Sequence, residues 1–180
     1  PKTDPHSEVE FTKNKDGTIT GRNVVGFINN ISTNTIVIGA HFDHLGYGGD
    51  GSLYRDSVKA IHNGADDNAS GTAVMLDLAR KLKNKNNQNN YIFIAFSGEE
   101  MGLLGSNYFV KNPTINTKNV SYMINMDMVG RLKQDSALAV YGTGTSPMFK
   151  QVLKAHNSTF KLIENESDVG PSDHTSFYLS

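Results

Sequence analysis

Acidic and histidine side chains stand where apolar segments of this sequence end. GAHFDH carries His41 and Asp43, FSGEEMG carries Glu99 and Glu100, and NMDMVG carries Asp127. Imidazole and carboxylate ligands without sulfur suit a catalytic zinc, manganese or cobalt ion rather than a closed structural site. The chain has no cysteine, which excludes disulfides, thiolate nucleophiles and cysteine-ligated metals. The pattern therefore indicates metal-dependent chemistry.

Two further segments add candidate ligands. GADDNASG places Asp66 beside Asp67 ahead of a helical pattern, where one acid is enough to cap the helix and the other is spare. SDHTSF carries His174 near the end of the chain, although the polar residues before it also favour a simple turn. If Asp66 bridges two ions, each ion has three protein ligands and shares a water, as in two-metal hydrolases. The expected ligands are then His41, Asp66, Glu100, Asp127 and His174.

Several of these residues also have a plainer structural interpretation. His41 could be a packed or capping histidine, and Glu99 with Glu100 could be the acidic start of a helix. The spacing of His41 and Asp43 favours a metal site, because both can point to one face of a strand and the carboxylate can then orient the ring. Asp127 interrupts an apolar strand, where an unpaired carboxylate would cost several kcal/mol without a partner cation.

Alternating strands and helices must position these side chains. The run at 91–98 is almost continuously apolar, which is typical of a strand buried in a parallel sheet. From 69 to 82 apolar residues recur at helical spacing, with basic residues at the end. Similar patterns predict strands at 23–30, 34–42, 121–128, 137–142 and 160–163, and helices at 100–110 and 147–156. The order predicts an α/β fold whose mostly parallel sheet is covered on both faces, with function at the carboxyl ends of its strands.

Length and charge limit the remaining possibilities. At 180 residues the chain fits one domain, with residues 1–20 as an irregular lead-in or a short hairpin. Its 17 Lys and Arg are scattered among 18 Asp and Glu, so no basic surface is expected for nucleic acid. No apolar run approaches the length of roughly 20 residues that spans a bilayer.

Over residues 35–178 the chain resembles the co-catalytic di-zinc aminopeptidases of metallopeptidase family twenty-eight. The resemblance rests on the order and spacing of five segments: GAHFDH, GADDNASG, FSGEEMGLLGS, NMDMVG and SDHTSF. The resemblance implies a three-layer αβα sandwich of the zinc-exopeptidase type and two Zn²⁺ ions, for which Mn²⁺ or Co²⁺ could substitute. It implies that His41 and Asp127 hold one zinc. Glu100 and His174 would hold the other, and Asp66 would bridge the two.

The resemblance also implies a reaction. Glu99 would be the general base, taking a proton from the bridging water and delivering it to the departing amine. Asp43 would orient His41, and Asp67 would cap the helix or support the site. The substrates would be peptides or small proteins with a free N-terminus, and the location would be secreted or periplasmic.

The chain departs from the family at its C-terminus. Relatives continue past the SDH segment through another strand and a closing helix, whereas this chain ends at Ser180, so we expect a truncated catalytic domain. Two alternatives stay open. A glutaminyl cyclase would use a similar scaffold with one zinc, and a binding module without catalysis would be expected to lack ligands or the base. The oligomeric state and the side-chain preference are left open by the sequence.

Overall fold

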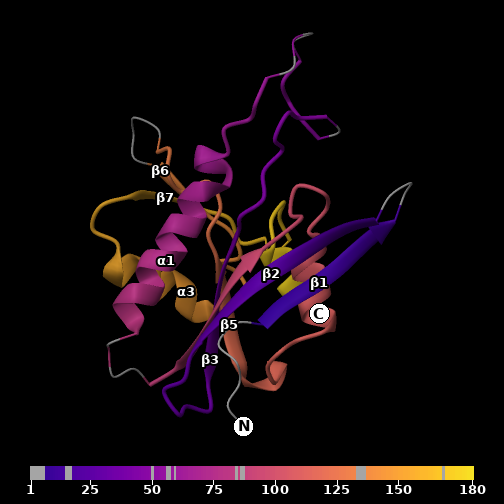
Figure 1. Cartoon of the computed structure of the whole chain (residues 1–180). Helices are drawn as coiled ribbons and strands as arrows, with labels where there is room; N and C mark the ends of the chain where they lie inside the picture. Colours follow the sequence, from indigo (N-terminus) through magenta and orange to yellow (C-terminus); the bar gives the residue numbers. More distant parts are fainter. Residues whose placement is uncertain are drawn as a thin grey trace.

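The computed structural model describes residues 7–14, 18–49, 51–55, 58, 60–83, 85, 88–132, 137–167 and 169–180, with side chains from residue 20 onward. The central strands are β1 (Ser7–Asn14), β2 (Thr18–Ile28), β3 (Thr35–His41), β4 (Asn90–Phe96) and β5 (Val120–Asn125). They form one sheet in the order β1-β2-β4-β3-β5 (Figure 1). β3 runs parallel to β4 and β5, whereas β2 runs antiparallel to β1 and β4. The sheet is therefore mixed, with a parallel centre.

Helices cover both faces of this sheet. The helical elements are a π-helical segment η1 (Ala65–Ser70), α1 (Gly71–Leu82), α2 (Leu104–Lys111), the 3₁₀ turn η2 (Thr117–Asn119), α3 (Pro147–His156) and α4 (His174–Tyr178). α1 and α2 lie on opposite sides of the sheet (Figure 1). A second, two-stranded parallel sheet consists of β6 (Ala137–Val140) and β7 (Lys161–Glu164). Among the described residues, none of the helices is long and apolar enough to cross a membrane.

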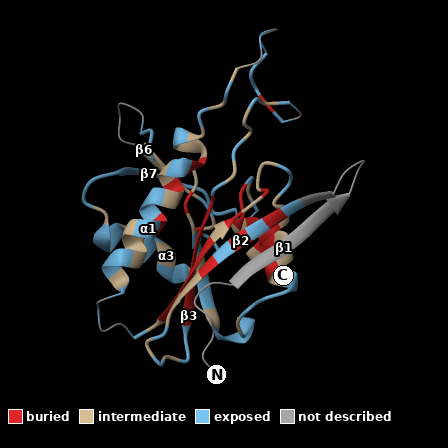
Figure 2. Ribbon diagram, viewed as in Figure 1, coloured by how far each residue is buried: buried red, intermediate tan, exposed pale blue. Residues whose placement is uncertain are grey.

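Side-chain alternation along the central strands divides the core into two layers. Val37 of β3 and Ile92 of β4 face the side of α2, where Phe109 is buried with them. Ile38 faces the other side and packs with Met75 of α1. Successive residues of a strand point to opposite faces, so two apolar layers require strands that are apolar throughout. Figure 2 shows the buried residues concentrated in these central strands, while α3 has no buried residue.

Of the two alternatives for residues 1–20, an irregular lead-in or a short hairpin, the antiparallel pairing of β1 with β2 supports the hairpin. The structure corrects three expectations about the other elements. The helix expected at 100–110 begins only at Leu104, after a turn in which Leu103 has φ of 58°. β5 ends at Asn125, so Asp127 lies in the following loop rather than within a strand. His174, expected in a loop, is the first residue of α4.

A buried asparagine ties three elements together behind the turn that carries the paired glutamates. Asn23 of β2 donates from Nδ2 to the carbonyl O of Gly105 at 2.8 Å and accepts from the backbone N of Ser97 at 3.1 Å. A Cβ on Gly105 would lie 2.3 Å from Asn23 Oδ1, so only glycine permits this approach. The contact fixes the end of β4 against α2, and with it the start of the turn that leads to Glu99.

Candidate metal centre

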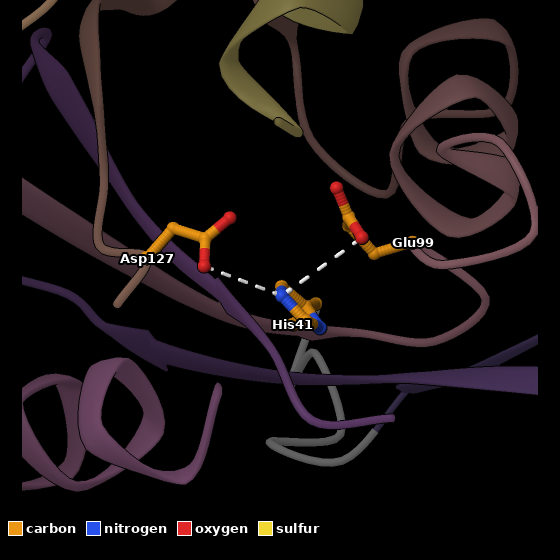
Figure 3. Close-up of side chains that lie close together, drawn as sticks. All are labelled: His41, Glu99 and Asp127. Atoms are coloured by element: carbon orange, nitrogen blue, oxygen red, sulfur yellow. Dashed lines mark ion pairs between the residues drawn. The ribbon is translucent and has the colours of Figure 1, made fainter. Parts of the chain in front are cut away.

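The carboxyl ends of the three parallel strands bring together His41, Glu99 and Asp127. His41 is the last residue of β3, while Glu99 and Asp127 follow β4 and β5. Ligand-binding residues collect at this edge of parallel sheets. One ligand atom from each residue lies within 4.8 Å of the others, which is close enough for the three to surround one ion. Figure 3 shows the two carboxylates on opposite sides of the imidazole ring.

The histidine Nε2 atom is the centre of this group. It lies 3.4 Å from Asp127 Oδ1, 3.9 Å from Glu99 Oε2 and 3.1 Å from Asp67 Oδ1. The ring is fully buried, and no described residue makes a hydrogen bond of acceptable geometry to Nε2. A buried nitrogen of this kind is costly unless it has a partner. A nitrogen lone pair surrounded by carboxylate oxygens is a donor set that fits zinc.

Asp43 contacts Nδ1, the other ring nitrogen of His41. His41 Nδ1 lies 3.1 Å from the backbone carbonyl O of Asp43 and 3.7 Å from its Oδ1. The same carboxylate accepts a hydrogen bond of 3.2 Å from the backbone N of Glu99. A proton on Nδ1 leaves the Nε2 lone pair for a metal, as is usual for metal-binding histidines. The orienting role expected of Asp43 is therefore shared between its carbonyl, which makes the shorter contact, and its carboxylate.

The electrostatics of the group show an excess of negative charge. Burial acts to lower the pKa of His41, but the adjoining carboxylates of Asp127 and Asp43 outweigh it and raise the pKa to about 11. Burial raises the pKa of Glu99 to about 8, and the neighbouring Asp173 and Asp127 add to the rise although the charge of His41 opposes it. Carboxylates crowded in this way need a cation, which is either a protonated histidine or a metal ion.

The two adjacent acids make different contacts. Asp67, with φ −104° and ψ 94°, leaves the helical conformation of η1, and its Oδ1 lies 3.1 Å from His41 Nε2. Asp66 instead directs its Oδ1 to the backbone N of Gly130, at 2.9 Å. The expectation that Asp66 bridges two ions stays a prediction that this geometry does not support, because its Oδ1 accepts from the loop after β5, although Asp66 lines the same cavity as Asp67. Asp67 is the acid of the pair that lies beside His41.

Glu100 and His174 were expected to share the second ion. Glu100 lines the same cavity as Asp67, and burial followed by the charge of Asp67 raises its pKa. His174 lies beside Tyr141, with ring centroids 6.4 Å apart, and its Nε2 is buried without a hydrogen bond to any described residue. Burial lowers its pKa. Within the described residues, the group that could hold a metal does not include His174.

Two residues of the SDH segment, Ser172 and Asp173, lie close to the candidate metal ligands, which the sequence did not indicate. Ser172 donates from Oγ to Asp127 Oδ2 at 2.7 Å and accepts from Asn125 Nδ2 at 2.8 Å. Asp173 is fully buried, and burial raises its pKa to about 6, although the hydroxyl of Ser106 opposes the rise. The only signal for them was their place before His174, which was interpreted as turn chemistry.

A cavity of about 580 Å³ opens beside this group. Asp67 and Glu100 lie in its wall together with His44, His62 and Arg131. His62 is fixed by its Nε2, which lies 2.7 Å from the hydroxyl of Ser52. The carboxylates of Asp66, Asp67 and Glu100 line the cavity, and its volume is within the range of small-ligand sites.

Comparison with known proteins identifies the family. A profile of Peptidase family M28 matches residues 23–179. A probable leucine aminopeptidase of Trichophyton verrucosum is 33% identical over 165 residues, covering 86% of this chain and 42% of that protein. Aminopeptidase YwaD of Bacillus subtilis is 34% identical over 132 residues, covering 71% of this chain and 29% of that protein. The chain thus spans less than half the length of these curated relatives.

Solved structures agree with this result. A zinc aminopeptidase from Bacillus subtilis superimposes with a TM-score of 0.67 at 28% identity, covering 89% of this chain and 38% of the other. A glutaminyl cyclase from Bacteroides thetaiotaomicron superimposes with a TM-score of 0.74 at 22% identity, covering 97% of this chain and 65% of the other, and this likeness concerns the fold. The sequence segments, the parallel strand ends and the family match lead to one conclusion: this chain belongs to Peptidase family M28.

Proposed function

We propose that this chain is a metal-dependent aminopeptidase domain that hydrolyses the peptide bond after a free N-terminal residue. The observation that carries the proposal is the buried Nε2 of His41, which makes no hydrogen bond of acceptable geometry to a described residue and is surrounded by carboxylates, including Glu99 Oε2 at 3.9 Å. Relatives above 30% identity include proteins named as aminopeptidases and zinc metalloproteases, which supports the same reaction.

His41, Asp67 and Asp127 are the proposed ligands of a first zinc ion. Asp67 and Glu100, which share the cavity wall, are the proposed ligands of a second ion, with Asp67 as the bridge. His174, the remaining predicted ligand, stays a prediction that the described geometry does not support. Bound zinc would lower the pKa of a water molecule and polarise the scissile carbonyl. Manganese or cobalt, which accept the same nitrogen and oxygen ligands, are proposed substitutes.

Glu99 is the proposed general base. Its carboxylate is mostly buried, and its backbone N is fixed by Asp43 Oδ1 at 3.2 Å, so the side chain is presented from a held turn. An ionised Oε2 takes the proton of the attacking water, and the same oxygen then delivers that proton to the departing amine. The pKa of about 8, to which burial raises Glu99 in the metal-free chain, is close to the neutral range in which a carboxyl group can do both.

The cyclase alternative has less support. The glutaminyl cyclase structure is 22% identical, which shows the fold alone. Together with His41 and Asp127, the cavity residues Asp67 and Glu100 make four candidate ligands, one more than the three protein ligands of a single catalytic zinc. The same group and the position of Glu99 disfavour a binding module without catalysis. A secreted or periplasmic location, taken from the family, is also proposed, and fractionation of the source cells tests it.

The test combines metal analysis with catalysis. Elemental analysis of the purified chain is expected to give two zinc equivalents. Hydrolysis of a panel of aminoacyl-p-nitroanilides is expected to stop after chelation and to recover when zinc is restored. Glu99→Gln should keep the metal while losing roughly 100-fold or more in kcat, since it removes the general base. Glu166→Gln, at an exposed carboxylate that pairs with Lys150, is the matched control.

Each other result has a defined meaning. One zinc equivalent with turnover of N-terminal glutamine alone would establish the cyclase instead. A chain that binds zinc but hydrolyses nothing would be a binding module. Full activity in Glu99→Gln would refute the assigned base.

A further inference from the structure

Two segments that carry proposed metal ligands are joined by hydrogen bonds that, among the described residues, run from side chains of the first segment to the backbone of the second. The segment 65–71 carries Asp67, and the segment 126–130 carries Asp127. Asp66, Asn68 and Ser70 reach from the first segment to the backbone of the second. We call these three residues the clamp.

The clamp makes hydrogen bonds to the backbone of four of the five residues of the segment 126–130. Asn68 donates from Nδ2 to the carbonyl O of Met126 at 2.9 Å and accepts from the backbone N of Met128 at 3.3 Å. The next bond, of 3.0 Å, runs from Val129 N to Ser70 Oγ. Gly130 N then donates to Asp66 Oδ1 at 2.9 Å, as described above.

The side chains of the clamp also make hydrogen bonds within their own segment. Ser70 Oγ donates to the carbonyl O of Asp66 at 2.7 Å, and Asn68 Oδ1 accepts from Gly71 N at 3.0 Å. The two loops approach so closely that a Cβ on Gly71 would lie 2.2 Å from the carbonyl O of Met126. Asn68 is buried, so its hydrogen bonds are shielded from water and its amide can hold one arrangement.

We propose that Asp66 is a positioning residue that fixes the separation of Asp67 and Asp127. It does so through its hydrogen bond to Gly130, at the far end of the loop that Asn68 holds near Met126. This inference rests on the proposed function, because it assigns the two flanking acids of that site. The two adjacent acids therefore have different roles: Asp67 faces His41, and Asp66 holds the loop that carries Asp127.

As a member of the clamp, Asp66 acts as a hydrogen-bond acceptor, so its role depends on the side-chain oxygen and not on the negative charge. Asp66→Asn keeps an Oδ1 that can accept from Gly130 N, whereas Asp66→Ala removes it. A metal ligand would behave differently, because an amide oxygen is a far poorer ligand for zinc than a carboxylate. The two variants thus separate positioning from ligation.

The experiment uses the 180-residue chain with zinc and with cobalt as a spectroscopic probe. Metal affinity is measured by titration, and the visible absorption of the Co²⁺ form reports the ligand geometry. Asp66→Ala is expected to weaken metal binding or kcat by about 10- to 100-fold and to change the Co²⁺ spectrum, as removal of residues that support ligands commonly does. Asp66→Asn should restore both to within about threefold of the unaltered chain. Asp77→Ala, which removes an exposed acid paired with Lys81, is the control for folding and net charge.

Other outcomes overturn the proposal in distinguishable ways. An unchanged affinity, spectrum and kcat in Asp66→Ala would refute the positioning role while leaving the proposed function intact. Equal loss in Asp66→Asn and Asp66→Ala would show that Asp66 acts through its charge, as a ligand does. If Asp66→Ala does not fold, the Asn variant still decides, together with Ser70→Ala, which should alter the Co²⁺ spectrum in the same direction. An unaltered chain that binds no metal and hydrolyses nothing would refute both the function and the clamp.

Discussion

Zinc binding to the metal-free chain is expected to release a proton from His41. The carboxylates of Asp127 and Asp43 raise the pKa of this buried ring to about 11 against the effect of burial, so at pH 7 it is protonated. Zinc needs the Nε2 lone pair, which the proton occupies. The ring is fully buried, so solvent does little to weaken this competition.

The size of the effect follows from the pKa. A pKa of about 11 lies four units above pH 7, and at ~1.36 kcal/mol per unit the displaced proton costs about 5 kcal/mol of zinc binding. Because this proton must leave at every pH below that pKa, His41 alone makes the apparent affinity rise about tenfold for each pH unit between pH 6 and 8, and any proton released by Glu99 makes the rise steeper. Glu99, whose pKa burial raises to about 8, can release up to one further proton at pH 7 when the cation arrives.

Isothermal titration calorimetry measures this release directly. Zinc is titrated into the chelated and dialysed chain in three buffers that differ in ionisation enthalpy, and the slope of the observed enthalpy gives the number of protons. Between one and two protons are expected at pH 7. His156→Gln, at an exposed histidine of α3, should leave the number unchanged, whereas His41→Gln should abolish tight binding. Release of less than half a proton, or an affinity independent of pH, would refute the assignment of His41 as a ligand that is protonated when metal-free.

Three further predictions concern stability. The unfolding free energy of the metal-free chain should fall as pH rises from 6.5 to 8. Over this range the folded state still holds protons on His41 and Glu99, whose folded pKa values are about 11 and about 8, whereas the unfolded state has released them; urea titrations at both ends that gave a flat or rising trend would contradict this. Asn23→Ala should lower the unfolding free energy by about 2–4 kcal/mol, since it leaves two buried backbone groups without their hydrogen-bond partner. A loss of less than ~1 kcal/mol in a urea titration would be inconsistent with the bridging role of Asn23. Phe109→Ala should cost about 3–5 kcal/mol because the ring is 1% exposed in the core beneath α2, whereas Val24→Ala, at a side chain that is 49% exposed, should cost far less in the same assay.

The order of strands and helices could be predicted from local patterns alone. The continuous apolar run of β4 and the helical periodicity of α1 are properties of short segments, and both elements lie within two residues of their predicted bounds. The parallel arrangement followed from their alternation, and with it the meeting of His41, Glu99 and Asp127 at one edge of the sheet. For residues 1–20 the sequence left an irregular lead-in and a hairpin open, and the antiparallel pairing of β1 with β2 decided for the hairpin.

Which acid of the adjacent pair faces His41 could not be decided from the sequence. Asp66 and Asp67 are chemically identical neighbours, and their directions depend on the backbone of η1, where Asp67 leaves the helical conformation. In the structure Gly130, 64 residues from Asp66 along the chain, donates its N–H to Asp66, while Asp67 lies beside the histidine. His174 likewise belonged to a recognisable segment, yet its position at the start of α4 depends on packing in three dimensions. The sequence by itself determined which residue types gather at the strand ends, whereas the contacts between loops distant in sequence decided which side chains face one another.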